Sequence, residues 1–174
     1  MDVDLTVVEE DITVLDVDVI VNAANEALRP GGGVCGQIHR AAGPELAWAC
    51  AESVRALGPC RTGKARITPG FDLPALWVVH AVGPVCQGGS ARETHFLAET
   101  YRYALRLAGS RGVATIAFPA ISTGIFGYPL VEATKIAVGT VRETLPRSPS
   151  IRQVVFATFG EDATQAYHAA LAPG

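Results

Sequence analysis

Short apolar runs alternate along the chain with longer stretches in which apolar residues recur at helical spacing. The short runs are rich in β-branched residues and end at polar residues, glycine or proline, which predicts strands. The six predicted strands cover residues 5–8, 18–22, 65–68, 77–82, 114–119 and 151–158. The run at 18–22 is apolar throughout between its polar ends, as is typical of a strand that is covered on both faces.

The longer stretches predict five helices. The first starts after the glycines at 31–33 and breaks at Gly43-Pro44, because this pair cannot continue a regular helix. The other four cover residues 45–57, 92–108, 129–145 and 162–171. Pro129 suits the first turn of its helix, where no backbone donor is needed.

Strands that alternate with helices of this length indicate a mostly parallel sheet with helices on both faces. The chain has 174 residues, which fits a single domain over residues 1–174 with a full core. Apolar residues make up 49% of it and charged residues 18%, so the composition is that of a globular α/β domain.

Several classes of protein are disfavoured. The apolar runs are too short to cross a bilayer, and the acidic start at residues 1–4 is not that of a signal peptide, so we expect a cytoplasmic protein with no membrane partner. The net charge of −3 gives no electrostatic reason for a broad footprint on duplex nucleic acid. The four cysteines have no C-x-x-C spacing, so no metal is expected, and no cofactor either. No heptad pattern argues for assembly, and we expect a monomer.

Three unusual loops follow predicted strands, at the edge where parallel sheets bind their ligands. They contain residues 22–33, 121–127 and 159–162. Glycine-rich loops and helix N-termini expose backbone N–H groups that bind anions, and two such loops facing each other suit a diphosphate. The alternative is that the glycines only shape turns.

Gly31, Gly33 and Gly36 also satisfy the G-x-G-x-x-G pattern of dinucleotide-binding proteins. However, these glycines lie about nine residues beyond the predicted strand, and the acid expected roughly 20 residues further on is not clearly placed. A dehydrogenase is therefore disfavoured.

Four motifs carry a resemblance to a known family. The segments 19–25 and 31–39 closely resemble the signature of macro domains, and 80–84 and 119–129 match it in the same order. The chain is most similar to the MacroD-type branch of ADP-ribosyl hydrolases. The resemblance implies the three-layer α/β/α macro domain fold, with a mixed, mostly parallel sheet, and a pocket for ADP-ribose.

The resemblance also implies roles for individual residues. Asp11 would accept a hydrogen bond from the adenine amine, the Ile12 backbone would lie beside the ring, and Phe159 would pack against it. Asn25 would bind the hydroxyls of the distal ribose. The remaining residues implied in ADP-ribose binding are Asn22, Ala23, Gly31, Gly32, Gly33, Val34, Cys35, Ile38, Pro119, Ser122, Thr123, Gly124, Ile125 and Phe126. Two alternatives remain open: Asp11 as a helix N-cap and Phe159 as a core residue.

Cys35 departs from the family pattern, because MacroD-type hydrolases carry an aspartate at this position that is thought to orient or activate water. An aspartate is ionised at neutral pH, whereas a thiol with a pKa near 8.5 is only a few per cent thiolate. The helix N-terminus or a pairing with His39, one turn further on, could favour the thiolate. The simpler interpretation is a small buried residue that lines the pocket.

Three functions therefore stay open. The first is a hydrolase that releases ADP-ribose from a modified acidic side chain, an ADP-ribosylated nucleotide or DNA end, or O-acetyl-ADP-ribose. Its water would be held by the diphosphate and would attack the anomeric carbon, with Asn25, Gly33 and Cys35 as the catalytic residues. The second is a reader that binds ADP-ribosylated protein without chemistry, and the third is a phosphatase on ADP-ribose 1″-phosphate. Asn25 and the complete triple glycine favour the hydrolase.

Overall fold

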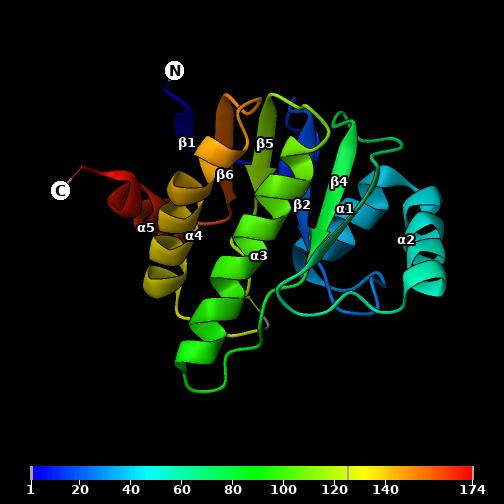
Figure 1. The fold of residues 1–174 in the computed structure, drawn as a ribbon, viewed down its shortest axis with the longest axis horizontal. Coiled ribbons are helices and arrows are strands. Elements are labelled where there is room, and N and C mark those ends of the chain that lie inside the picture. Colours follow the sequence, from blue (N-terminus) through cyan, green and yellow to red (C-terminus); the bar gives the residue numbers. More distant parts are fainter. Residues whose placement is uncertain (1, 125, 174) are drawn as a thin grey trace.

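The computed structural model describes residues 2–124 and 126–173. Its centre is one six-stranded sheet with the order β1-β6-β5-β2-β4-β3 (Figure 1). The strands are β1 (Asp4–Glu9), β2 (Val19–Ala23), β3 (Ala65–Pro69), β4 (Trp77–Ala81), β5 (Thr115–Phe118) and β6 (Gln153–Thr158). All neighbours pair in parallel except β3 and β4, so the sheet is mixed and mostly parallel, as predicted.

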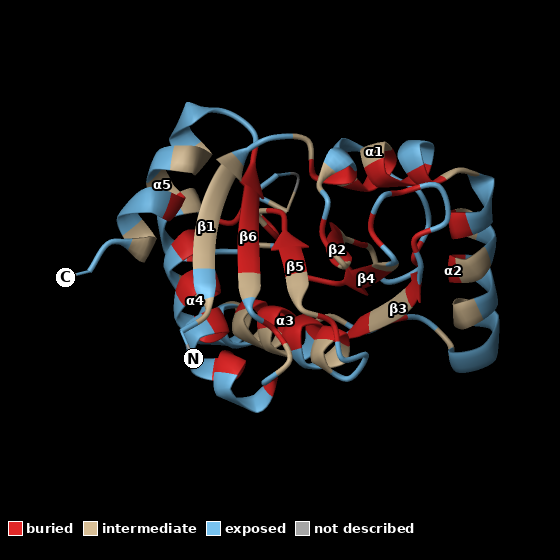
Figure 2. Ribbon diagram, turned by 90° about the horizontal axis from the view of Figure 1, so that it is seen from above, coloured by how far each residue is buried: buried red, intermediate tan, exposed pale blue. Residues whose placement is uncertain are grey.

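Helices cover both faces of this sheet and confirm the three-layer arrangement (Figure 2). They are α1 (Gly33–Ala42), α2 (Pro44–Leu57), α3 (Ala91–Gly109), α4 (Leu130–Thr144) and α5 (Glu161–Leu171), with short 3-10 turns η1 (Ile12–Val14) and η2 (Leu145–Arg147). The larger core lies between the sheet and the helices α3, α4 and α5. A smaller core packs α1, η1 and Leu46 of α2 against the other face.

Most element boundaries differ from the prediction by a residue or two, and two of the differences have a clear local cause. Pro129 occupies the N-cap position of α4 with an extended ψ of 131° and so lies just before the first turn. The last strand begins at Gln153, because Ile151 belongs to a turn in which its N–H donates to the Ser148 carbonyl at 3.1 Å. No helix of residues 2–124 and 126–173 is both long and apolar enough to span a bilayer.

The topology brings the ends of five parallel strands to one edge of the sheet. β1, β6, β5, β2 and β4 lie side by side and point the same way, so the segments that follow them meet at their carboxyl ends. These segments include the three loops that the sequence singled out.

Candidate functional site

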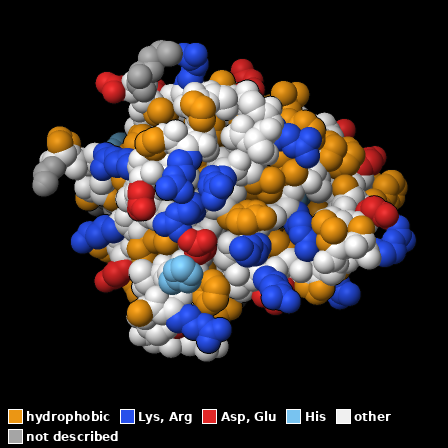
Figure 3. All heavy atoms as spheres, in the orientation of Figure 1, with side chains coloured by type: hydrophobic (Ala, Val, Ile, Leu, Met, Phe, Trp, Pro, Cys, Tyr) orange, Lys and Arg blue, Asp and Glu red, His pale blue; other side chains and the backbone are white. Residues whose placement is uncertain are grey.

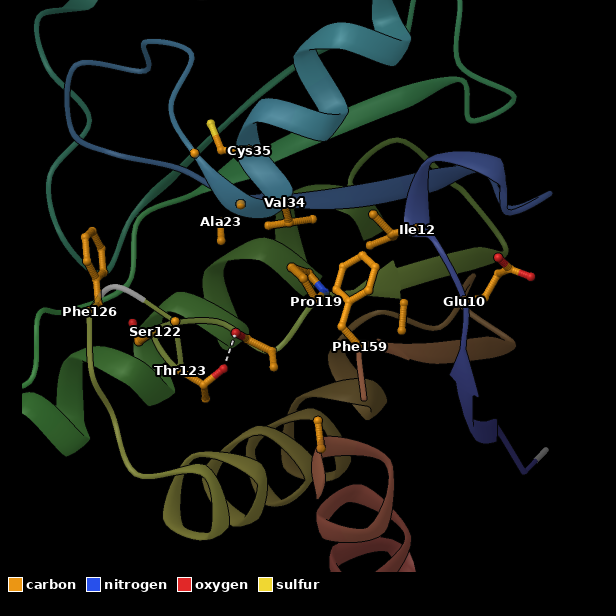
Figure 4. A pocket seen from close by; sticks show the side chains of 16 residues that line it. Glu10, Ile12, Ala23, Val34, Cys35, Pro119, Ser122, Thr123, Phe126 and Phe159 are labelled. Carbon is orange, nitrogen blue, oxygen red and sulfur yellow. Dashed lines mark hydrogen bonds between the residues drawn. The ribbon is translucent and has the colours of Figure 1, made fainter. Parts of the chain in front are cut away.

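A cavity of about 310 Å³ lies where these loops meet (Figure 4). Many of the predicted ligand-binding residues line it: Ile12, Ala23, Gly32, Gly33, Val34, Cys35, Pro119, Ser122, Thr123, Gly124, Phe126 and Phe159. Four lining residues were not predicted, namely Glu10, Ala120, Ala157 and Ala163. Ile125 lies outside the described residues.

The first wall of the cavity is the start of α1. Gly32 is the N-cap and has no side chain to satisfy the N–H groups of the first turn, which a helix leaves without internal partners. Gly33 has a φ of 55°, which favours glycine. Gly31 does not line the cavity, but its carbonyl oxygen would lie 2.5 Å from a Cβ at Gly36. The close packing of this loop on its helix therefore requires a glycine at position 36.

The second wall is the loop after β5. The Tyr128 N–H donates to the Ser122 carbonyl at 2.7 Å, and the Gly127 N–H donates to the Gly124 carbonyl at 2.9 Å. The Thr123 hydroxyl donates to the Ala120 carbonyl at 2.9 Å, a bond that Figure 4 draws. These bonds close the loop upon itself, and its described residues face the glycines of α1 across the cavity.

Charge in the cavity comes from the backbone rather than from cationic side chains. Among the described residues that line it, Glu10 is the only one with a carboxylate, and none is a lysine or arginine. Lys and Arg side chains are visible instead over α3 and α4, interspersed with acidic and apolar ones (Figure 3). An anion in the cavity would therefore depend on backbone N–H groups and on the N-terminal end of α1.

Apolar groups form one end of the cavity. The Phe159 ring lies between Ile12 and Pro119 (Figure 4), and 58% of this residue is exposed. The core interpretation of Phe159 is therefore wrong: it leaves a ring face open to a planar ligand. Ile12, by contrast, is 1% exposed and belongs to the smaller core as well as to the cavity wall.

Asp11 is the N-cap of η1 and does not line the cavity. Its Oδ1 accepts hydrogen bonds from the Thr13 N–H at 2.9 Å and from the Thr13 hydroxyl at 2.7 Å. The alternative that Asp11 is an N-cap is thus confirmed. The contact of Asp11 with adenine stays a prediction, and it would involve the other carboxylate oxygen, Oδ2. The neighbouring Glu10 lines the cavity instead.

At the opposite end, Asn25 and Cys35 both contact one carbonyl. The Asn25 side chain clamps Arg29, donating to its carbonyl at 2.9 Å and accepting from its N–H at 3.0 Å. The Cys35 thiol donates to the same carbonyl, with Sγ 3.7 Å from the oxygen. Cys35 lines the cavity, but Asn25 does not. In this structure Asn25 therefore fixes the loop that leads to the glycines, and its contact with the ribose remains a prediction.

Two further residues implied in binding lie behind the cavity rather than in its wall. Ile38 is fully buried in the smaller core, on the side of α1 that faces the sheet. Asn22 is fully buried, and its Nδ2 lies 3.1 Å from His80 Nδ1 and 3.7 Å from Cys35 Sγ. Asn22 thus supports Cys35 from behind.

Burial keeps the two histidines behind this wall neutral. His80 Nε2 lies 3.0 Å from the Thr68 hydroxyl, and burial, with a smaller contribution from His39, lowers the pKa of His80 to about 3. Burial also lowers the pKa of His39, whose ring nitrogens have no hydrogen-bond partner among the described residues. The pairing of Cys35 with His39 considered from the sequence is therefore not formed, because the imidazole makes no bond to the thiol.

The sequence is similar to those of known proteins. The profile of the family described as Macro domain matches residues 21–137. A macro domain-containing protein of Chlorobaculum tepidum is 52% identical over 167 residues, which are 96% of this chain and 95% of that protein. An Enterobacter protein named O-acetyl-ADP-ribose deacetylase is 52% identical over 163 residues, which are 94% of this chain and 91% of that protein.

Solved structures agree in fold. A mutant macrodomain of Oceanobacillus iheyensis with ADPR has a TM-score of 0.91 and 41% identity, covering 96% of this chain and 91% of that one. The Trypanosoma brucei macrodomain in complex with ADP-ribose has a TM-score of 0.87 and 40% identity, covering 97% of this chain and 69% of that one.

Proposed function

The chain belongs to the macro domain family, and from this premise we propose that it binds ADP-ribose in the cavity and hydrolyses a group carried by the distal ribose. The observation that carries the proposal is a pair of backbone-lined loops that face each other across a cavity without lysine or arginine. Such loops suit a diphosphate. Phe159 then receives the adenine, and the distal ribose lies at the end where Cys35 is found.

The names of the relatives suggest the substrate class. Several relatives that are 50–52% identical are named O-acetyl-ADP-ribose deacetylase, and this name describes the cleavage of an acyl ester. An acidic side chain that carries ADP-ribose has the same kind of bond. We therefore propose carboxylic esters of the distal ribose as substrates. In this proposal water adds to the acyl carbon and not to the anomeric carbon expected from the sequence. The ester bond breaks and the proton goes to the ribose oxygen, giving a carboxylic acid and ADP-ribose.

The reaction has to proceed without the usual aspartate. A thiol at position 35 is a weak base, so we assign most of the rate enhancement to positioning and to backbone dipoles, which can supply a large part of it. The diphosphate holds the water, and the clamp between Asn25 and Arg29 keeps the glycine loop in place.

The test is release of free ADP-ribose from O-acetyl-ADP-ribose and from a protein modified on acidic side chains. Wild type should release it, and Asn25→Ala should abolish release while the protein stays folded. Gln165→Ala is the matched control, because within the described part of the chain this exposed amide bonds only to Glu161 on α5. Tight binding of ADP-ribose without release from either substrate would identify a reader. Inorganic phosphate released from ADP-ribose 1″-phosphate would identify a phosphatase.

A further inference from the structure

Ser122 combines two unfavourable features at the wall of the cavity. Its φ is 67°, in the left-handed region that residues with a side chain rarely adopt. It is 6% exposed, and its hydroxyl has no hydrogen-bond partner among the described residues. Buried hydroxyls normally have partners, and strained backbone persists mainly at functional sites, where the fold enforces it.

Gly83, which follows β4, makes the room for this hydroxyl. A Cβ at Gly83 would lie 2.3 Å from Ser122 Oγ and 2.6 Å from Ile121 Cγ2. Both distances are too short for real contacts, so any larger residue would displace the serine side chain. The Ser122 carbonyl is held from the other side by the Tyr128 N–H at 2.7 Å. The fold thus leaves room for this hydroxyl beside Gly83 but gives it no partner among the described residues.

Ser122 lies at the end of the cavity that is remote from Phe159. Ser122, Phe126 and Cys35 are on the side away from Glu10 and Phe159 (Figure 4). If adenine occupies the Phe159 end, the acyl group of the substrate lies beside Ser122. During ester hydrolysis the carbonyl oxygen of this group gains negative charge, and a fixed donor stabilises it.

We propose that the Ser122 hydroxyl donates a hydrogen bond to the acyl carbonyl oxygen of the substrate in the transition state, and that Gly83 is the positioning residue for this hydroxyl. The proposal rests on the proposed esterase function. The hydroxyl keeps its proton throughout, and only the charge on the substrate changes. This donor supplies stabilisation at a site that has no carboxylate at position 35.

Ser122→Ala tests the proposal, with Ser148→Ala as the matched control. Ser148 is also a buried serine whose hydroxyl has no partner among residues 2–124 and 126–173, but it packs near Gly109 and does not line the cavity. Three quantities are measured for each variant: kcat on O-acetyl-ADP-ribose, the calorimetric Kd for ADP-ribose, and Tm.

Ser122→Ala should lower kcat about 100-fold, the effect of losing one oxyanion donor. The Kd for ADP-ribose should change less than about threefold, because the product lacks the acyl group, and Tm should stay level or rise, since an unsatisfied buried hydroxyl is removed. Ser148→Ala should leave kcat and Kd unchanged. Gly83→Ala keeps the hydroxyl but displaces it, so its kcat should fall in the same direction.

Two results would overturn the inference in a protein that is otherwise active. One is an unchanged kcat in Ser122→Ala. The other is a loss of ADP-ribose affinity as large as the loss in kcat, which would assign the hydroxyl to the ADP-ribose moiety itself. A wild-type protein that binds ADP-ribose but releases no acetate would instead refute the proposed function, and the two failures are therefore distinguishable.

Discussion

Phe159→Ala should weaken ADP-ribose binding strongly while leaving the fold intact. A phenylalanine buries about 150–250 Å² when it is covered completely. Because 58% of Phe159 is exposed, about 100 Å² remains open to a ligand. An adenine that covers one ring face would remove roughly half of this from water, worth about 1.3 kcal/mol at ~25 cal/mol per Å². The aromatic contact adds about 1 kcal/mol.

The sum of about 2 kcal/mol corresponds to a roughly 30-fold increase in Kd. Isothermal titration calorimetry with ADP-ribose measures it, and urea unfolding of the free protein should change by less than about 1 kcal/mol, as for other exposed positions. Phe71→Ala is the control, since Phe71 is 40% exposed and does not line the cavity. An unchanged Kd in Phe159→Ala would refute the adenine assignment, and a large loss of stability would show that the ring is structural.

Four more predictions concern other parts of the site. Asp11→Ala should weaken the affinity for ADP-ribose by one to two orders of magnitude and destabilise η1 by about 1 kcal/mol through loss of its N-cap. Asp11→Asn should keep the N-cap. Equal calorimetric affinity in wild type and Asp11→Ala would refute the adenine contact. Cys35→Asp should raise ester turnover at least about tenfold, since a positioned base contributes 10²–10⁴; an unchanged rate would show that no base is missing. The pKa of His80 is about 3 in the folded protein and near 6.5 in the unfolded chain, so its contribution to stability is complete above pH 6.5 and falls as the pH drops toward 3. At pH 5 the loss in the free energy of unfolding is about 2 kcal/mol. Urea unfolding at pH 7 and pH 5 measures this loss, and equal stability would contradict a buried neutral imidazole. Turnover should be the same with and without EDTA, because the described residues contain no cluster of three or more His, Cys, Asp or Glu that could hold a metal. A loss of turnover in EDTA that magnesium restores would overturn this expectation.

The helices and strands could be predicted because hydrophobic periodicity is a local property of the sequence. Periodicity does not show whether β3 runs parallel or antiparallel to its neighbour. The length of the connection between β3 and β4 does show it. Residues 70–76 are too few for the crossover that a parallel pair requires, which is a dozen residues or more, and β3 therefore pairs with β4 in antiparallel.

The residues that line the cavity could be anticipated from the sequence where the backbone itself forms the wall, and less well where the direction of a side chain decides. Asn22 and Ala23 are neighbours in β2, and successive side chains of a strand point to opposite faces, so Ala23 lines the cavity and Asn22 does not. The missed residues Ala120, Ala157 and Ala163 have no polar group that would single them out in a sequence. Only the path of the chain brings them to the cavity.

The reliance of this cavity on main-chain groups has a consequence for how the protein can change over evolutionary time. A site built from charged side chains loses its ligand through a single substitution, whereas an amide N–H is present whatever side chain the residue carries. Drift is therefore constrained mainly at positions that set the course of the backbone, such as Gly36, where the Gly31 carbonyl leaves no space for a methyl group. Recognition of the anion can persist while residues such as Cys35 vary around it. The same scaffold can thus exchange one chemistry for another without first losing the ability to bind.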